Sequence, residues 1–120
     1  MSALSKLYPT PAESDLLTAV LEYLGILRLK AWRCNAGTVR LRGRVFRGAP
    51  KGTPDVLGYL APRGRMFAIE LKTERGRVSP EQATWQADAT AAGVLVATCR
   101  SLVEVKSAVT SWQRTERGQS

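Results

Sequence analysis

Three segments of the chain carry apolar residues at helical spacing, and each has its own start signal. The first opens with a Thr-Pro-Ala-Glu capping box, and we expect it to span residues 11–24 and to end at Gly25. The second opens with a Ser-Pro-Glu-Gln box, is expected to end at Gly93, and has one face made of Trp85, Ala89 and Ala92. The third begins at Ser101 and directs a longer apolar set toward the core: Leu102, Val105, Ala108, Val109 and Trp112.

Alternating or continuous apolar runs predict four strands, at residues 26–35, 55–60, 66–72 and 94–98. A turn with Pro and Gly separates the middle two, which we therefore expect to pair as an antiparallel hairpin. Between residues 36 and 53 four glycines divide short alternating pieces, which predicts a mobile hairpin or loop. The expected order is α-β-β-β-α-β-α, an α/β fold with helices covering one sheet.

The composition is that of one globular domain over residues 1–120. The chain is 44% hydrophobic and 23% charged, and its length suits a single core. We expect that core within about residues 10–113 and a frayed polar tail over 114–120. Eighteen Lys and Arg against ten Asp and Glu leave a formal net charge of +8, which predicts a polyanionic partner.

Missing residue types narrow the chemistry. Without histidine the chain cannot build a Ser-His or Cys-His nucleophile pair or a His-ligated zinc site. Cys34 and Cys99 form no CxxC motif, so neither a redox motif nor a disulfide framework is expected. No signal peptide and no membrane-length apolar segment are recognisable, and we expect an intracellular, cytoplasmic protein.

A small charged site is predicted on the expected hairpin. Glu70 and Lys72 are two residues apart on a strand, so they project from the same face, while Ile69 and Leu71 point to the other. Asp55, at the start of the preceding strand, meets Glu70 if the register brings the two close. Two carboxylates there would form a Mg²⁺ site, and Lys72 would orient or deprotonate the attacking water.

These motifs resemble the virus-type replication and repair nuclease (VRR-NUC) domain, a branch of the PD-(D/E)xK nuclease superfamily. The superfamily signature consists of Pro54-Asp55 and Glu70-Leu71-Lys72. Features typical of the branch are Lys-Gly-Thr-Pro-Asp at 51–55, Thr73, Ser-Pro-Glu-Gln at 79–82 and Trp-Arg-Cys-Asn-Ala-Gly at 32–37. The similarity covers residues 13–102 and implies a restriction-endonuclease-like core with a central mixed sheet.

The resemblance also implies roles for individual residues. The family's functional positions fall on Asp55 and Glu70 as metal ligands, the Leu71 carbonyl as a further ligand, Lys72 as the catalytic lysine, and Glu13 and Gln82 as additional catalytic residues, with Glu13 a possible metal ligand. Such nucleases use Mg²⁺, for which Mn²⁺ substitutes.

Each of these positions also has a structural explanation. Glu13 and Gln82 both occupy the third helical position after a capping residue, as does Glu104, for which no catalytic role is suggested. Glu70 and Lys72 could form a salt-bridged strand edge, and Pro-Asp is ordinary turn chemistry. Trp32 either packs in the core or stacks on a nucleic-acid base.

The segment 36–53 is strongly basic, and no acid occurs between Tyr23 and Pro54. We expect its cations and their neighbours to bind DNA phosphates: Arg33, Arg40, Arg42, Arg44, Arg47 and Lys51. The alternative is a solvated loop that is basic for solubility.

The combined expectation is a Mg²⁺-dependent DNA endonuclease. The resemblance further implies a homodimer that cuts branched DNA such as a Holliday junction, because one small chain carries one site and two cuts need two copies. Alternatives are a catalytically silent nucleic-acid-binding domain, a nicking or restriction-type nuclease, and a ribosomal-type RNA-binding protein.

Overall fold

A computed structural model describes residues 11–34 and 38–118, without the side chains of Pro11 and Val39. Thr10 of the first capping box, the Asn-Ala-Gly end of the 32–37 motif and the last two residues of the expected tail lie outside the described residues. Within the described ranges, no helix is both long and apolar enough to cross a membrane.

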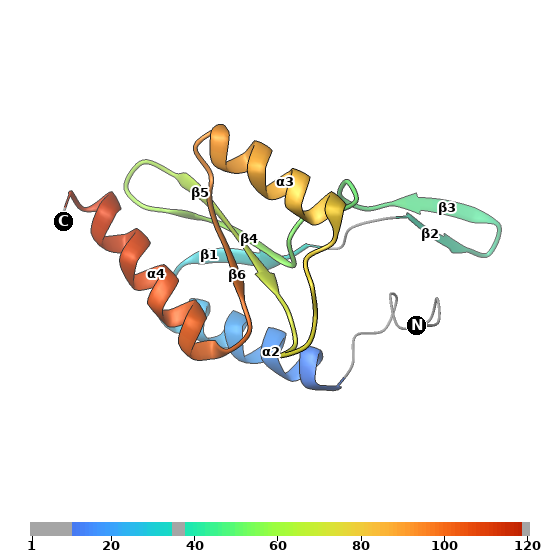
Figure 1. Ribbon diagram of the computed structural model, residues 1–120, viewed down its shortest axis with the longest axis horizontal. Helices are drawn as coiled ribbons and strands as arrows, with labels where there is room; N and C mark the ends of the chain where they lie inside the picture. Colours follow the sequence, from blue (N-terminus) through green and yellow to red (C-terminus); the bar gives the residue numbers. More distant parts are fainter. Residues whose placement is uncertain (1–10, 35–37, 119–120) are drawn as a thin grey trace.

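Four strands form the central sheet in the order β1-β4-β5-β6 (Figure 1). Their bounds are Lys30–Arg33 for β1, Val56–Leu60 for β4, Arg65–Leu71 for β5 and Leu95–Cys99 for β6. β1, β4 and β5 pair antiparallel, and β6 runs parallel to β5, so the sheet is mixed. The expected α/β class, hairpin and element order are confirmed, with a second, separate hairpin inserted after β1.

Within the described part of the chain three helices flank the sheet, with α3 on one side and α2 and α4 on the other (Figure 1). Their bounds are Pro11–Ile26 for α2, Pro80–Ala91 for α3 and Leu102–Glu116 for α4. The core lies between the sheet and the α2–α4 pair, where Val20, Leu24, Val105 and Val109 join the buried Phe67 and its strand neighbours. The apolar face predicted for the third helix is therefore confirmed.

The first helix ends later than the sequence predicted. Gly25 lies inside α2, and the chain turns instead at Arg28, which has a positive φ of 60°. The backbone N–H groups of Arg28 and Leu29 donate to the carbonyls of Gly25 and Leu24, which closes the last turn. The expected strand 26–35 is shortened to β1 because its first residues belong to this helix end.

Two segments are less buried than expected, and one is more so. β6 is an edge strand of the sheet, and Cys99 is its one buried residue. α3 has no buried residue, and Ala92, which directly follows it, is exposed. By contrast α4 continues through residues expected to fray, because the buried Glu116 carboxylate accepts hydrogen bonds from Arg63 and Arg65 at 3.4 and 2.9 Å. The prediction of a frayed tail was wrong for residues 114–116.

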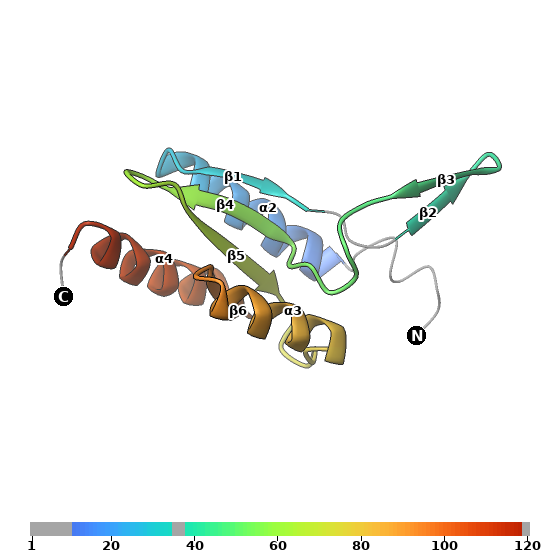
Figure 2. The same cartoon turned by 90° about the horizontal axis from the view of Figure 1, so that it is seen from above.

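A separate hairpin, here called the arm, projects away from the sheet (Figures 1 and 2). It consists of β2, Thr38–Leu41, and β3, Arg44–Arg47. The turn residues Arg42 and Gly43 both have positive φ, 51° and 74°, as a type I′ hairpin turn requires. The arm contributes to the 50 Å long axis of the molecule and confirms the hairpin expected within 36–53.

Candidate active site

Asp55 and Glu70 lie side by side where β4 begins and β5 ends. Val56 pairs with Ile69, which places Asp55 opposite Glu70 at the next position of the ladder. The Asp55 Oδ2 atom accepts a hydrogen bond from the Leu71 backbone N–H at 2.8 Å. Ile69 and Leu71 are buried on the opposite face of the sheet, as the alternation predicted. The hairpin register therefore brings the two predicted carboxylates together.

The two oxygens of Glu70 have different surroundings. Oε1 accepts a hydrogen bond from Gln82 Nε2 at 3.0 Å and lies 3.6 Å from the Lys72 ammonium. Oε2 is buried and, among the described residues, is the one buried side-chain polar atom without a hydrogen-bond partner. An unsatisfied buried oxygen is costly, so this atom is suited to a ligand that the protein itself does not supply.

The surroundings of Glu70 oppose its negative charge. Burial and, after it, the neighbouring Asp55 charge raise its pKa from 4.5 to about 8, and Lys72 offsets only part of the effect. The Glu70 carboxyl therefore holds a proton at neutral pH when no cation is bound. A carboxylate pair with such a shift is typical of a functional site.

The pair fits a divalent cation. Hard oxygen ligands from one or two carboxylates are what Mg²⁺ uses in protein sites, and Oε2 of Glu70 together with Asp55 provides them. Among the described residues no three Asp, Glu or Cys side chains gather as a metal-binding group. Glu13 lies half-buried in the first turn of α2, and its possible role as a metal ligand stays a prediction.

Gln82 serves the helix cap and the site simultaneously. Its Oε1 accepts from the Ser79 N–H at 2.8 Å, while the Ser79 hydroxyl accepts from the Gln82 N–H at 3.1 Å, which completes the predicted capping box. The Nε2 atom of the same amide donates to Glu70. The sequence left cap and site contact as alternatives, and in the structure one side chain makes both.

The segment before Asp55 packs directly on the start of α3. Gly52 has a φ of 92°, and any side chain there would collide with the backbone carbonyl of Glu81. Beyond it, the Thr53 hydroxyl donates to the Pro50 carbonyl at 2.6 Å. This close approach explains the Gly-Thr-Pro-Asp motif, because it fixes the position of Asp55 relative to the helix that carries Gln82.

Two residues near the site were not assigned a role from the sequence. The Cys34 N–H donates to the Asp55 carbonyl at 2.7 Å, and burial, followed by the Asp55 charge, raises the pKa of its thiol. The Arg100 guanidinium donates to the carbonyls of Thr73 and Gly76, each at 2.6 Å, and so holds the loop that leaves Lys72. Both contacts join residues that are far apart in the sequence, so no local sequence pattern predicts them.

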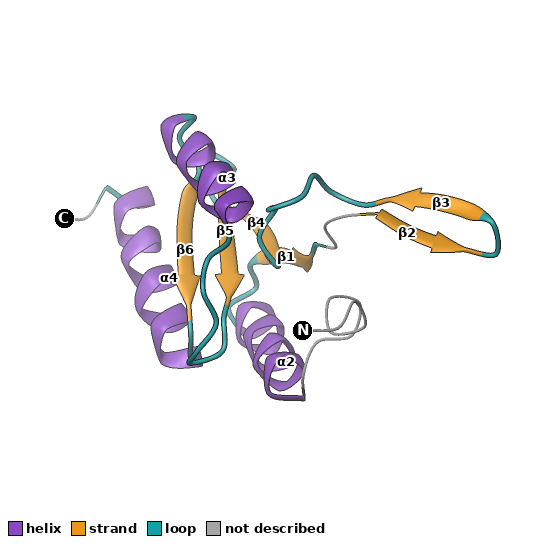
Figure 3. Cartoon of the chain, turned by 45° about the vertical axis from the view of Figure 1, so that its right-hand side comes forward, coloured by secondary structure: helices purple, strands orange, loops and turns teal. Residues whose placement is uncertain are grey.

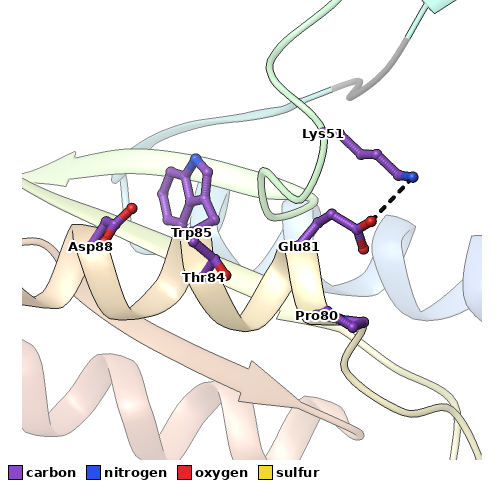
Figure 4. A pocket seen from close by; sticks show the side chains of 6 residues that line it. All are labelled: Lys51, Pro80, Glu81, Thr84, Trp85 and Asp88. Atoms are coloured by element: carbon purple, nitrogen blue, oxygen red, sulfur yellow. Dashed lines mark ion pairs between the residues drawn. The ribbon is translucent and has the colours of Figure 1, made fainter.

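The predicted DNA-binding cations fall into three groups. Arg33 ends β1, next to Cys34 and hence close to Asp55. Lys51 pairs with Glu81 at 3.3 Å across an exposed hollow beside α3, into which Trp85 points (Figure 4). The other four lie on the arm, away from the carboxylates and exposed: Arg40, Arg42, Arg44 and Arg47.

Comparison with known proteins is consistent with this geometry. The family model of the VRR-NUC domain matches residues 22–103. A solved structure titled "VRR_NUC domain" superposes with a TM-score of 0.60 at 22% sequence identity, covering 82% of this chain and 95% of the other. No curated protein matches the chain. Figure 3 shows the sheet and helices of this chain, with the arm extending beyond them.

Proposed function

The chain belongs to the VRR-NUC family, a nuclease-type domain, and from that premise we propose that it is a Mg²⁺-dependent DNA endonuclease. The observation that carries the proposal is Glu70 Oε2, a buried carboxylate oxygen without a donor beside a second carboxylate, Asp55. A bound Mg²⁺ or Mn²⁺ would polarise the scissile phosphate and lower the pKa of the attacking water. The Leu71 carbonyl is a proposed further ligand.

The remaining side chains position the reacting groups. Lys72, 3.6 Å from Glu70 Oε1, is placed to hold or deprotonate a water near the carboxylates. Gln82 holds Oε1 by its amide donor, so that Oε2 stays directed to the cation. Glu13 acts from α2 on the same site without forming part of the carboxylate pair. The Arg side chains of the arm bind phosphates and supply affinity without base specificity.

The test is cleavage of labelled DNA with Mg²⁺, with Mn²⁺ and with EDTA. We expect cutting with either ion and none with EDTA, and loss of cutting in Glu70→Gln, which keeps the shape of the side chain. Ser107→Ala, on the exposed surface of α4, is the matched control and should cut normally. DNA binding without cutting under every condition would instead favour the catalytically silent binding domain.

We further propose that the active form is a homodimer that prefers branched DNA. One chain holds one carboxylate pair, so paired cuts require two copies related by a two-fold axis. Leu41 and Phe46, on one face of the arm, are 59% and 53% exposed and give a second copy an apolar surface to cover. A two-stranded hairpin alone is marginally stable, which supports such a cover.

Sedimentation with and without a four-way junction tests this finer proposal. We expect a dimer that dissociates in the Leu41→Ser/Phe46→Ser variant and cuts a junction faster than linear duplex. A monomer in both states, or equal cutting of both DNAs, would contradict it while leaving the metal-dependent nuclease intact.

A further inference from the structure

One half of a sheet face is left open beside the candidate site. On the face that carries Glu70, α3 packs on β6. No described helix covers this face over β1 and β4. The register places Trp32 next to Leu57, and Tyr59 next to Met66, on this same face. Trp32 is 49% exposed and Tyr59 45%. Two aromatic side chains on adjacent strands are thus presented to solvent.

The rows on this face lead to the carboxylates. Asp55 and Glu70 form the first row, Trp32 and Leu57 the second, and Tyr59 and Met66 the third, and each row is two positions along the strand from the next. At about 3.3 Å per strand residue the rows are roughly 6.6 Å apart. This is comparable with the span of one nucleotide in an extended single strand.

The electrostatics of this half suit a polyanion. Between Tyr23 and Glu70, Asp55 is the sole acid in the sequence, so β1 and β4 carry none. Lys30 lies on the same face beside Tyr59, whereas the exposed Arg33, which pairs with Val56 at the end of β1, belongs to the opposite face. By contrast the hollow beside α3 is lined by Glu81 and Asp88, which repel phosphate (Figure 4).

We propose that the open sheet half binds an unpaired segment of DNA, whose bases stack on Trp32 and Tyr59 while its backbone leads to Asp55 and Glu70. Aromatic side chains on an open sheet are a general platform for unstacked bases, because every base has a π-face. A duplex keeps its bases stacked on one another and cannot use the two rings. The inference rests on the proposed nuclease function and specifies its substrate as DNA with unpaired nucleotides at the cutting site.

Binding is measured in EDTA, by fluorescence anisotropy, with three probes of equal length: oligo-dT, the same strand with abasic sites, and a duplex. Trp32→Leu and Tyr59→Leu should each weaken oligo-dT binding about 5- to 150-fold, the range of one base-stacking contact. Neither should change affinity for the abasic strand or the duplex. Trp32→Phe, which keeps an aromatic ring, should retain most of the affinity. Val103→Ala, on α4 and 74% exposed, is the control and should bind normally.

Three results would overturn the proposal. Equal weakening on duplex and oligo-dT would mean a general surface effect, and equal wild-type affinity for abasic and normal strands would mean that bases make no contact. Dissociation of a dimer by Trp32→Leu, with unchanged DNA affinity, would assign the face to a second copy. If the leucine variants fail to fold, the proposal is still tested by comparing the affinities of the wild type and of Trp32→Phe for the normal and the abasic strand.

The outcome is separable from that of the nuclease proposal, because the binding assay contains no metal and needs no cleavage. A chain that shows base-dependent binding through Trp32 but cuts no DNA would refute the nuclease and retain this site. A chain that cuts DNA but binds abasic and normal strands equally would refute the base-stacking site and retain the nuclease.

Discussion

Asp55 accepts a hydrogen bond from the backbone N–H of Leu71 across the β4–β5 hairpin, at 2.8 Å. The bond ties the segment before β4 to the end of β5 and directs one carboxylate oxygen toward the backbone. It gives Asp55 a structural task in addition to its proposed metal-binding task. The two tasks are separable by substitution because an amide can perform only the first.

Asp55→Asn is therefore expected to keep the fold and lose cleavage. The asparagine carbonyl can still accept from Leu71, but its neutral amide cannot replace a carboxylate at a cation, so cutting should fall by roughly 100-fold or more. Asp55→Ala should lose cleavage too and, by leaving the Leu71 N–H unsatisfied, should also lower the free energy of unfolding by about 1–3 kcal/mol. Thermal melting and cleavage of both variants make the comparison. Normal cutting by Asp55→Asn would mean that the metal ion binds elsewhere in the chain.

Gln82→Glu should separate the helix cap from the site. A glutamate is equally good at the third helical position of a capping box, so the Ser79 contact and the stability of α3 should persist. The change removes the donor to Glu70 Oε1 and adds a like charge, which should raise the pKa of Glu70 further and reduce cleavage. Ser79→Ala is the reverse control, with about 1 kcal/mol lost from stability and normal cutting below the melting temperature.

The pKa of about 8 for Glu70 predicts how metal-free stability depends on pH. Between its ordinary pKa of 4.5 and 8, the folded chain keeps a proton on Glu70 that the unfolded chain has lost. Folding therefore takes up a proton, and stability should fall as pH rises from about 5 to 8 and level off above. Melting in EDTA across this range measures the effect, and Glu70→Gln should flatten this fall. An unchanged slope in that variant would assign the dependence to other groups.

Local patterns were sufficient to predict the central elements of the site. The two-residue spacing of Glu70 and Lys72 determines that both face one side of β5, and the capping box at Ser79 determines where α3 begins. Both depend on residues close in sequence. The hairpin between β4 and β5 then places Asp55 beside Glu70, since a short turn leaves little freedom in register.

Features that depend on distant partners were missed or misjudged. Glu116 was assigned to a frayed tail, yet its buried carboxylate pairs with Arg63 of the β4–β5 turn and with Arg65 at the start of β5. Gly25 was expected to end α2, but the helix continues to Ile26 and the chain turns at Arg28. The burial of a strand or helix likewise depends on its place in the sheet, which apolar content alone does not reveal.

Removing three arm cations, in Arg40→Ala/Arg42→Ala/Arg44→Ala, should weaken binding to all DNA sequences about equally. Each lost phosphate contact should reduce the slope of log affinity against log salt by about 0.9, because fewer counterions are released. A matched triple change of exposed side chains on and directly after α4, Lys106, Arg114 and Arg117 to Ala, alters net charge by the same amount and is the control. Equal effects from both triple variants would mean that the arm contributes to DNA binding only through its net charge.

Glu13→Gln should lower cleavage about 10- to 100-fold, the usual effect of a group that supports a metal site without binding the ion, while the melting temperature barely changes. The reason is its location: Glu13 is half-buried in the first turn of α2, the helix that contacts β5, whose end carries Glu70. Glu104→Gln is the matched control, since Glu104 occupies the corresponding position of α4 and accepts from the Arg100 N–H at 3.3 Å. That control should lose a little stability and no activity. If Glu13→Gln instead behaves like Glu104→Gln, Glu13 belongs to the start of its helix and the active site consists of Asp55, Glu70, Lys72 and Gln82.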